Sequence, residues 1–142
     1  MAPIHDAARG GDIDTLRRLL AEGVSPDATD NEERTPLHLL CEYTNKDYNA
    51  SLSLVRTQQR YEYDRLDCFK LLRDAGANVE ASDSKGYRPL HFAAERGKKK
   101  MVSLLVQARV NVDATANHNA TALHLAARSS RRGSPDCVEV LL

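Results

Sequence analysis

The sequence predicts an all-α protein built as a solenoid of stacked helix pairs, and three observations lead to this prediction. A short motif that ends in histidine recurs in a register of 33 residues. Small residues and then a leucine pair follow each motif, as expected for two helices that pack closely. Aromatic residues make up only 5% of the 142 residues, whereas hydrophobic residues make up 42%, so the core must be aliphatic. A unit of this size cannot bury its apolar face alone, so neighbouring units must stack.

The recurring motif fixes where each unit begins. Its four copies are Ala2-Pro3-Ile4-His5, Thr35-Pro36-Leu37-His38, Arg88-Pro89-Leu90-His91 and Thr121-Ala122-Leu123-His124. The histidines are separated by 33, 53 and 33 residues, so the middle interval is one period with an insertion of 20. Proline suits the first turn of a helix, where its missing N–H costs nothing. Each motif therefore predicts the start of a first helix.

A second helix follows each motif. Val102, Leu105 and Val106 share one helical stripe at spacings of three and four. A glycine after the leucine pair supplies the left-handed residue that ends a helix. The paired small residues are Ala7-Ala8, Leu40-Cys41, Ala93-Ala94 and Ala126-Ala127, the leucine pairs are Leu19-Leu20, Leu71-Leu72, Leu104-Leu105 and Leu141-Leu142, and the glycines are Gly23 and Gly76.

The pattern resembles the ankyrin repeat, whose mark is a 33-residue period with Thr-Pro-Leu-His and two alanines. The resemblance implies one domain over residues 1–142, with antiparallel helix pairs, short β-hairpin or turn fingers, and a concave surface between the fingers and the first helices. The units are expected at about 1–28, 29–81 with an insertion at 44–66, 82–114 and 115–142, the last truncated.

Three positions depart from the family pattern. Gly86 keeps the fingertip glycine, but Glu33 and Asn119 replace it in the neighbouring fingers. Asn119 is a mild change because asparagine tolerates positive φ, whereas Glu33 predicts a distorted or more mobile turn. Arg109 replaces the glycine that ends the second helix of the third unit, and we expect it to keep the left-handed conformation. The fourth unit stops at Leu142, so its outer edge is expected to be covered by further repeats or by a neighbour.

The insertion at residues 44–66 falls between the two helices of the second unit. We expect the second helix of that unit to run from Asp64 to Ala75. An earlier start, at Ser51, is the alternative. Long loops cost little stability, so a tolerated surface insertion is one reading. Partner binding or self-association is the other, because a long loop is often functional.

The motif histidines and the cysteines, which could in principle bind a metal or act in catalysis, are expected to have structural roles. The motif histidines are expected to form hydrogen bonds rather than to bind a metal, and Cys41, Cys68 and Cys137 are expected to be buried. No base accompanies a nucleophile, so neither an enzyme nor a cofactor site is predicted. Two basic runs, Lys98-Lys99-Lys100 and Arg131-Arg132, fall in equivalent turns of adjacent units. They are either ordinary solvated turns or one basic patch that binds an acidic or phosphorylated partner.

The charge is divided along the chain although its sum is zero. Residues 1–43 contain nine acidic and four basic residues, a net charge of −5, whereas residues 84–142 contain four acidic and ten basic residues, a net charge of +6. No overall basic excess points to nucleic acid. No run of about 18 apolar residues predicts membrane insertion, and three cysteines without metal-type spacing favour the cytoplasm or the nucleus. A monomer is expected, with end-to-end association through the terminal repeat as an alternative.

The resemblance implies a non-catalytic module, or scaffold, that binds another protein and no small-molecule substrate. Two narrower alternatives stay open: a stand-alone inhibitor of an enzyme such as a kinase, and the substrate-recognition segment of a larger enzyme or ubiquitin-ligase adaptor. Tyr43, Tyr87 and Arg96 are expected to anchor the partner, because tyrosine and arginine are enriched at interface hot spots. The expected concave residues are Asn31, Glu32, Arg34, Glu42, Tyr43, Ser84, Lys85, Tyr87, Glu95, Arg96, Asn117, His118, Ala120 and Arg128.

Overall fold

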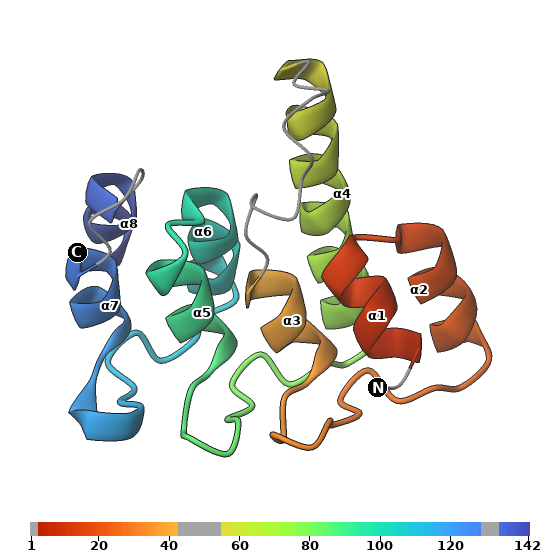
Figure 1. Cartoon of the computed structure of the whole chain (residues 1–142), viewed down its shortest axis with the longest axis horizontal. Coiled ribbons are helices and arrows are strands. Elements are labelled where there is room, and N and C mark those ends of the chain that lie inside the picture. Colours follow the sequence, from red (N-terminus) through yellow and green to blue (C-terminus); the bar gives the residue numbers. More distant parts are fainter. Residues whose placement is uncertain (1–2, 43–54, 129–133) are drawn as a thin grey trace.

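Helix pairs stacked side by side make up the part of the chain that the computed structural model describes (Figure 1). This part covers residues 3–42, 55–128 and 134–142, without the side chains of residues 55–64 and 134–136. No strand occurs within these ranges, so the predicted all-α class is confirmed and the fingers are turns rather than hairpins. The helices are α1 Pro3–Gly10, α2 Ile13–Ala21, α3 Pro36–Glu42, α4 Val55–Asp74, α5 Pro89–Glu95, α6 Lys99–Gln107, α7 Ala122–Arg128 and α8 Ser134–Leu141, with a short 3₁₀ turn η3 at Asn117–Asn119.

Two layers of helices stand above a row of fingers. The first helices α1, α3, α5 and α7 pack against one another in chain order and form the inner layer (Figure 1). Each also packs against the second helix of its own unit. The fingers all project from the same edge of the stack (Figure 1). The inner layer and the fingers therefore meet at an angle that runs along the whole molecule.

The core lies between the two layers and is mainly aliphatic, as predicted. Ala8 and Ala94 are fully buried in the inner layer, where a side chain without bulk lets the second helices approach. Leu16, Phe69 and Val102 occupy the same place on successive second helices and are also fully buried. The three differ in size, so each interface between units is filled by a different combination of side chains.

In three units the second helix is followed closely by a residue with a left-handed backbone, and this residue is either glycine or arginine. Gly23 and Gly76 have φ angles of 88° and 92°. Arg109 takes their place in the third unit with a φ of 63°. The predicted conformation of Arg109 is therefore confirmed.

The expectation of a distorted fingertip at Glu33 is wrong. Glu33 has a φ of 60°, against 81° for Gly86, and both residues donate their N–H to the carbonyl three positions earlier at 3.0 Å. The third finger is the one that differs, because His118 and Asn119 are both left-handed and form η3. Ala116 stands there in place of Asp30 and Asp83, whose carboxylates shape the first two fingertips.

The insertion lengthens α4. Second helices α2 and α6 have 9 residues each, whereas α4 has 20 and begins at Val55, between the two starts that the sequence suggested. Its first turns rise beyond the neighbouring helices (Figure 1). Where α4 enters the stack, Arg65 is buried and donates from Nη2 to the carbonyl of Arg9 at 2.7 Å. This bond joins α4 to the last turn of α1.

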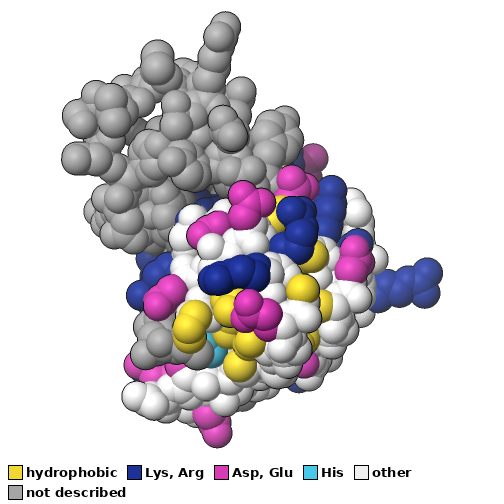
Figure 2. Space-filling model, turned by 90° about the vertical axis from the view of Figure 1, so that its right-hand side faces the viewer, with side chains coloured by type: hydrophobic (Ala, Val, Ile, Leu, Met, Phe, Trp, Pro, Cys, Tyr) yellow, Lys and Arg dark blue, Asp and Glu magenta, His cyan; other side chains and the backbone are white. Residues whose placement is uncertain are grey.

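Both ends of the stack expose hydrophobic side chains. Figure 2 looks onto the α1–α2 end, where hydrophobic side chains lie among acidic and basic ones. At the other end Val138, Val140 and Leu141 are half-buried against the core, whereas Leu142 is 88% exposed. End-to-end association through this edge stays a prediction.

Candidate interaction surface

The motif histidines join each inner helix to the next finger. The N–H of Thr35 donates to His38 Nδ1 at 3.0 Å, so the proton of the ring lies on Nε2, which donates to the carbonyl of Tyr87 at 2.8 Å. His5 Nε2 reaches the carbonyl of Arg34 at 3.0 Å in the same way. His91 Nε2 lies 2.9 Å from the carbonyl of Ala114, which precedes the third finger. The structural role predicted for these histidines is confirmed at all three junctions.

Burial keeps two of these histidines neutral. It lowers the pKa of His38 and of His91 below the usual 6.5, although hydrogen bonds to Tyr87 and Ala114 act in the opposite direction. A neutral ring is the form that accepts a hydrogen bond at Nδ1. Within the described residues, no group of histidines, cysteines and carboxylates has the arrangement of a metal site.

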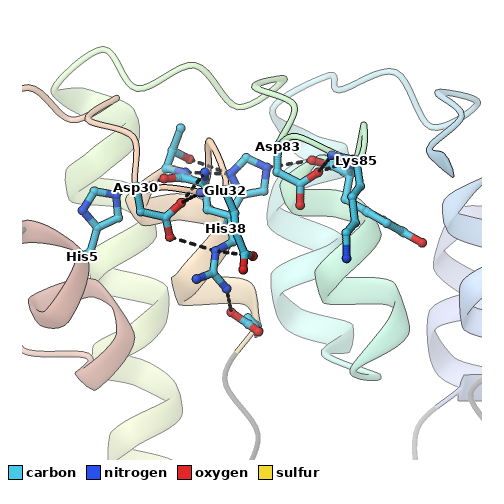
Figure 3. A network of polar contacts seen from close by, with 10 residues as sticks. His5, Asp30, Glu32, His38, Asp83 and Lys85 are labelled. Carbon is cyan, nitrogen blue, oxygen red and sulfur yellow. Dashed lines mark hydrogen bonds and ion pairs between the residues drawn. The ribbon is translucent and has the colours of Figure 1, made fainter. Parts of the chain in front are cut away.

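Two aspartates fold the first two fingertips. The carboxylate of Asp30 accepts the N–H groups of Glu32 and Arg34, each at 2.9 Å, and Asp83 accepts those of Lys85 and Tyr87 at 2.9 and 2.8 Å. Burial alone would raise the pKa of Asp30, but these N–H groups and the Arg34 guanidinium outweigh it and lower the pKa below 3.8. Figure 3 shows His5, Asp30, His38 and Asp83 in a row across neighbouring units.

Neighbouring fingers are also bonded directly to one another. Ser84 donates its N–H to the carbonyl of Glu32 at 2.9 Å, and Asn117 donates to the carbonyl of Lys85 at 3.1 Å. The fingertips are therefore one continuous backbone structure, held from below by the histidines. Side chains on this frame are presented in a fixed order and spacing.

The expected concave residues within the described ranges lie on the fingers or at the ends of the inner helices. Tyr43 lies outside the described residues. Arg34, Glu42, Tyr87, Glu95 and Ala120 are half-buried. The exposed members are Asn31, Glu32, Ser84, Lys85, Arg96, Asn117, His118 and Arg128.

Arg34 is an internal support rather than a free contact. Its guanidinium lies 2.9 Å from Asp30, 3.4 Å from Glu32 and 3.2 Å from Glu42, and only 16% of its side chain is exposed. The contact with Glu42 runs from the finger to the end of α3. Three carboxylates surround one guanidinium, so this part of the surface is acidic.

Tyr87 occupies in the third unit the place that Arg34 occupies in the second. Its ring lies 5.9 Å from that of Phe92 on α5, and Phe92 in turn meets His38 edge-on at 5.4 Å. The sequence-based site omitted Phe92. The available signal was an aromatic residue directly after the motif histidine, where the second and fourth units have Leu39 and Leu125. Tyr87 and Phe92 together form an aromatic patch in the middle of the surface.

The described cysteines offer no nucleophile. Cys41, Cys68 and Cys137 form no disulfide and all are buried, as predicted. Burial raises the pKa of Cys41 to about 12, although the nearby Arg65 acts in the opposite direction. Its thiol is therefore protonated at neutral pH. No described helix is both long enough and apolar enough to cross a bilayer.

Family models for ankyrin repeats match most of the chain. One model, described as ankyrin repeats in three copies, matches residues 59–142, and another, described as ankyrin repeats in many copies, matches residues 4–50. Together with the stacked helix pairs, these matches show that the chain belongs to the ankyrin repeat family. Ankyrin repeats are protein-interaction modules and are generally non-catalytic.

Curated relatives share the repeats within larger proteins. The putative E3 ubiquitin-protein ligase XBAT31 of Arabidopsis thaliana is 32% identical over 152 residues, which cover 98% of this chain and 28% of the relative. Inversin of Canis lupus familiaris is 33% identical over 140 residues, covering 98% and 11%. The potassium channel GORK of Arabidopsis thaliana is 35% identical over 95 residues, covering 67% and 9%. The chain thus spans less than a third of each of these relatives.

Proposed function

We propose that this chain is a non-catalytic module that binds a partner protein through the concave surface between its fingers and inner helices. The observation that carries the proposal is the hydrogen-bonded frame beneath that surface. Backbone bonds join successive fingers at Glu32–Ser84 and Lys85–Asn117, and His38 fixes the second finger from below. A preformed surface loses little conformational entropy on binding, so its exposed side chains contribute more fully to affinity.

The side chains on this frame suit protein recognition. Lys85, Arg96 and Arg128 are exposed, and the half-buried aromatic patch of Tyr87 and Phe92 lies among them. Interfaces typically combine an aromatic centre with a charged rim. Charged rim residues set the orientation and the rate of encounter more than the final affinity.

Affinity capture from cell lysate, quantified by mass spectrometry, tests the proposal. We expect Tyr87→Ala and Arg96→Ala each to lower recovery of the captured protein about tenfold, as loss of a hot-spot side chain does. Arg17→Ala on α2 and Arg73→Ala near the end of α4 are matched controls, because both side chains are exposed on the second-helix layer. Thermal melting of each variant checks that it folds. Unchanged recovery with both concave variants would exclude this surface.

A narrower function is favoured by one observation. XBAT31, whose name describes a putative ubiquitin ligase, aligns with nearly the whole of this chain. The chain would then recognise the protein that a larger ligase modifies. A transcript that joins residues 1–142 to a ligase domain would support this function, and a stop codon directly after Leu142 would exclude it.

A further inference from the structure

At three positions of the stack, an acidic side chain in an earlier unit is matched by a basic side chain in a later unit. The first position is the fingertip. Glu32 and Lys85 occupy the same place on successive fingers, because the carbonyl of each accepts the N–H of the next finger. Both side chains are exposed.

The second position is the end of the inner helix. Glu42 ends α3 and Glu95 ends α5, so this position is still acidic in the third unit, whereas Arg128 ends α7. The Arg128 side chain is 74% exposed and lies 3.7 Å from Glu95. A weak exposed pair of this kind leaves Arg128 available to a second carboxylate.

The third position is the start of the second helix. Asp12 caps α2 by accepting the N–H of Thr15 at 3.2 Å, and Lys98 occupies the same cap position before α6 without a side-chain bond to the helix. Exposed Lys99 and Lys100 follow Lys98. Positive charge at a helix start opposes the helix dipole, so these lysines act against local stability. Local rules are broken most often where a protein surface has a function.

The two charged zones stay separate in solution. The acidic zone comprises Asp12, Asp14, Glu32, Glu33 and Glu42, and the basic zone comprises Lys85, Arg96, Lys99, Lys100 and Arg128. Adjacent packed helices lie about 10 Å apart, whereas the screening length at physiological salt is about 8 Å. Charges in the first two units therefore cancel little of the field around the last two. The aromatic patch of Tyr87 and Phe92 belongs to the third unit and meets His38 of the second unit, on the side of the basic zone that faces the acidic zone.

We infer that the concave surface binds an extended partner segment of divided charge, with basic residues facing the acidic zone, acidic residues facing the basic zone and an apolar residue on the aromatic patch. This inference rests on the proposed function and specifies the chemistry of the partner. The scaffold does not require the division, because equivalent positions accept either sign. The sign pattern is therefore a property of the binding surface.

Two synthetic peptides of about ten residues test the inference, since an extended chain of that length spans roughly 30 Å. The first has lysines at one end, two leucines in the middle and glutamates at the other end. The second has the same composition with the charges alternating. Fluorescence anisotropy is expected to show that the divided peptide binds about fivefold or more tightly than the alternating one. Raising the salt concentration reduces this preference.

Charge-reversed variants show which surface is responsible for the preference for the divided peptide. Combined Lys85→Glu and Arg128→Glu is expected to remove the preference for the divided peptide, and the neutral pair Lys85→Ala and Arg128→Ala is expected to reduce it. Lys70→Glu with Arg73→Glu on α4 is the matched control and leaves it unchanged. Circular dichroism confirms that each variant folds.

Several outcomes would overturn the inference. They are equal binding of the two peptides, no binding of either, a preference that survives the concave reversal, or tighter binding of a single-stranded oligonucleotide. Lysate capture decides the proposed function separately. If Tyr87→Ala and Arg96→Ala lower capture while the peptides bind equally, the concave surface binds protein but not by divided charge.

Discussion

The helix exits show how a single residue affects this fold. Gly23, Gly76 and Arg109 hold the same left-handed backbone, which disfavours any residue with a Cβ atom. Nothing lies within 4 Å of a Cβ atom placed on Gly76, so only the backbone conformation distinguishes glycine from other residues there.

Arg109→Gly is therefore expected to stabilise the protein by about 1 kcal/mol and to raise its melting temperature by about 3–5 °C. Thermal unfolding followed by circular dichroism measures this. Gly76→Ala is the converse variant and should lower the melting temperature by a similar amount. A fall of several degrees with Arg109→Gly would contradict the left-handed assignment.

Cys41 provides a second test at the residue scale. Its side chain is 1% exposed and burial raises the pKa of its thiol to about 12, so the thiolate is scarce and inaccessible. We expect Cys41 to resist iodoacetamide at neutral pH in the folded protein and to react after unfolding in urea. Peptide mapping by mass spectrometry identifies the modified cysteine. Rapid alkylation of native Cys41 would show that the junction of α3 and α4 opens readily.

At the scale of the element, α2 and α6 differ in how they begin. Asp12 and Lys98 have nearly the same backbone angles, but only Asp12 accepts a hydrogen bond from its helix. Lys98→Asp is expected to stabilise the protein by about 1 kcal/mol, because it adds a cap and removes a positive charge from the helix start. Urea denaturation measures the change. Lys98→Ala separates the two effects, since it removes the charge without supplying a cap.

An equal gain for Lys98→Ala and Lys98→Asp would show that the charge matters and the cap does not. A loss of stability in Lys98→Asp would contradict the equivalence of the two helix starts. If the divided-charge surface is correct, Lys98→Asp also weakens binding of the divided peptide. Greater stability with weaker binding is the expected combination.

How far the sequence predicts these elements depends on how local their determinants are. The motif proline and histidine specify the inner helices through contacts a few residues apart, so α3, α5 and α7 begin where the motif indicates. The start of α4 has no such marker, because the inserted segment contains neither glycine nor proline.

The candidate site was predicted less completely than the fold. Arg34 was expected to face a partner, but three carboxylates from the finger and α3 surround it, and such pairings depend on tertiary structure. Phe92 was omitted because its contact with Tyr87 appears only when the finger folds over α5. Glu33 was expected to distort its turn because the stabilising role of Asp30 was not recognised.

At the scale of the whole molecule, stability depends on neutral histidines at the junctions between units. Folding lowers the pKa of His38 and His91 below 6.5, so the unfolded chain binds protons more readily than the folded chain. Their contribution to stability is present above pH 6.5 and is lost as the pH falls through the lower folded values. The free energy of unfolding should therefore decrease between pH 7.5 and pH 5.5.

Urea denaturation at several pH values measures this dependence. Replacement of both rings, His38→Gln with His91→Gln, should flatten it, because glutamine does not titrate. A folded state that became more stable on acidification over this range would contradict the neutral hydrogen-bonded rings.

The central claim is that partners occupy the angle between the fingers and the inner helices. Site-specific photo-crosslinking in lysate tests it most directly, with a photoreactive residue in place of Lys85 on the second finger or Arg17 on α2. Both positions are exposed, so neither replacement disturbs the core. We predict a discrete covalent adduct from position 85 and none from position 17. An adduct from position 17 with none from position 85 would contradict the claim.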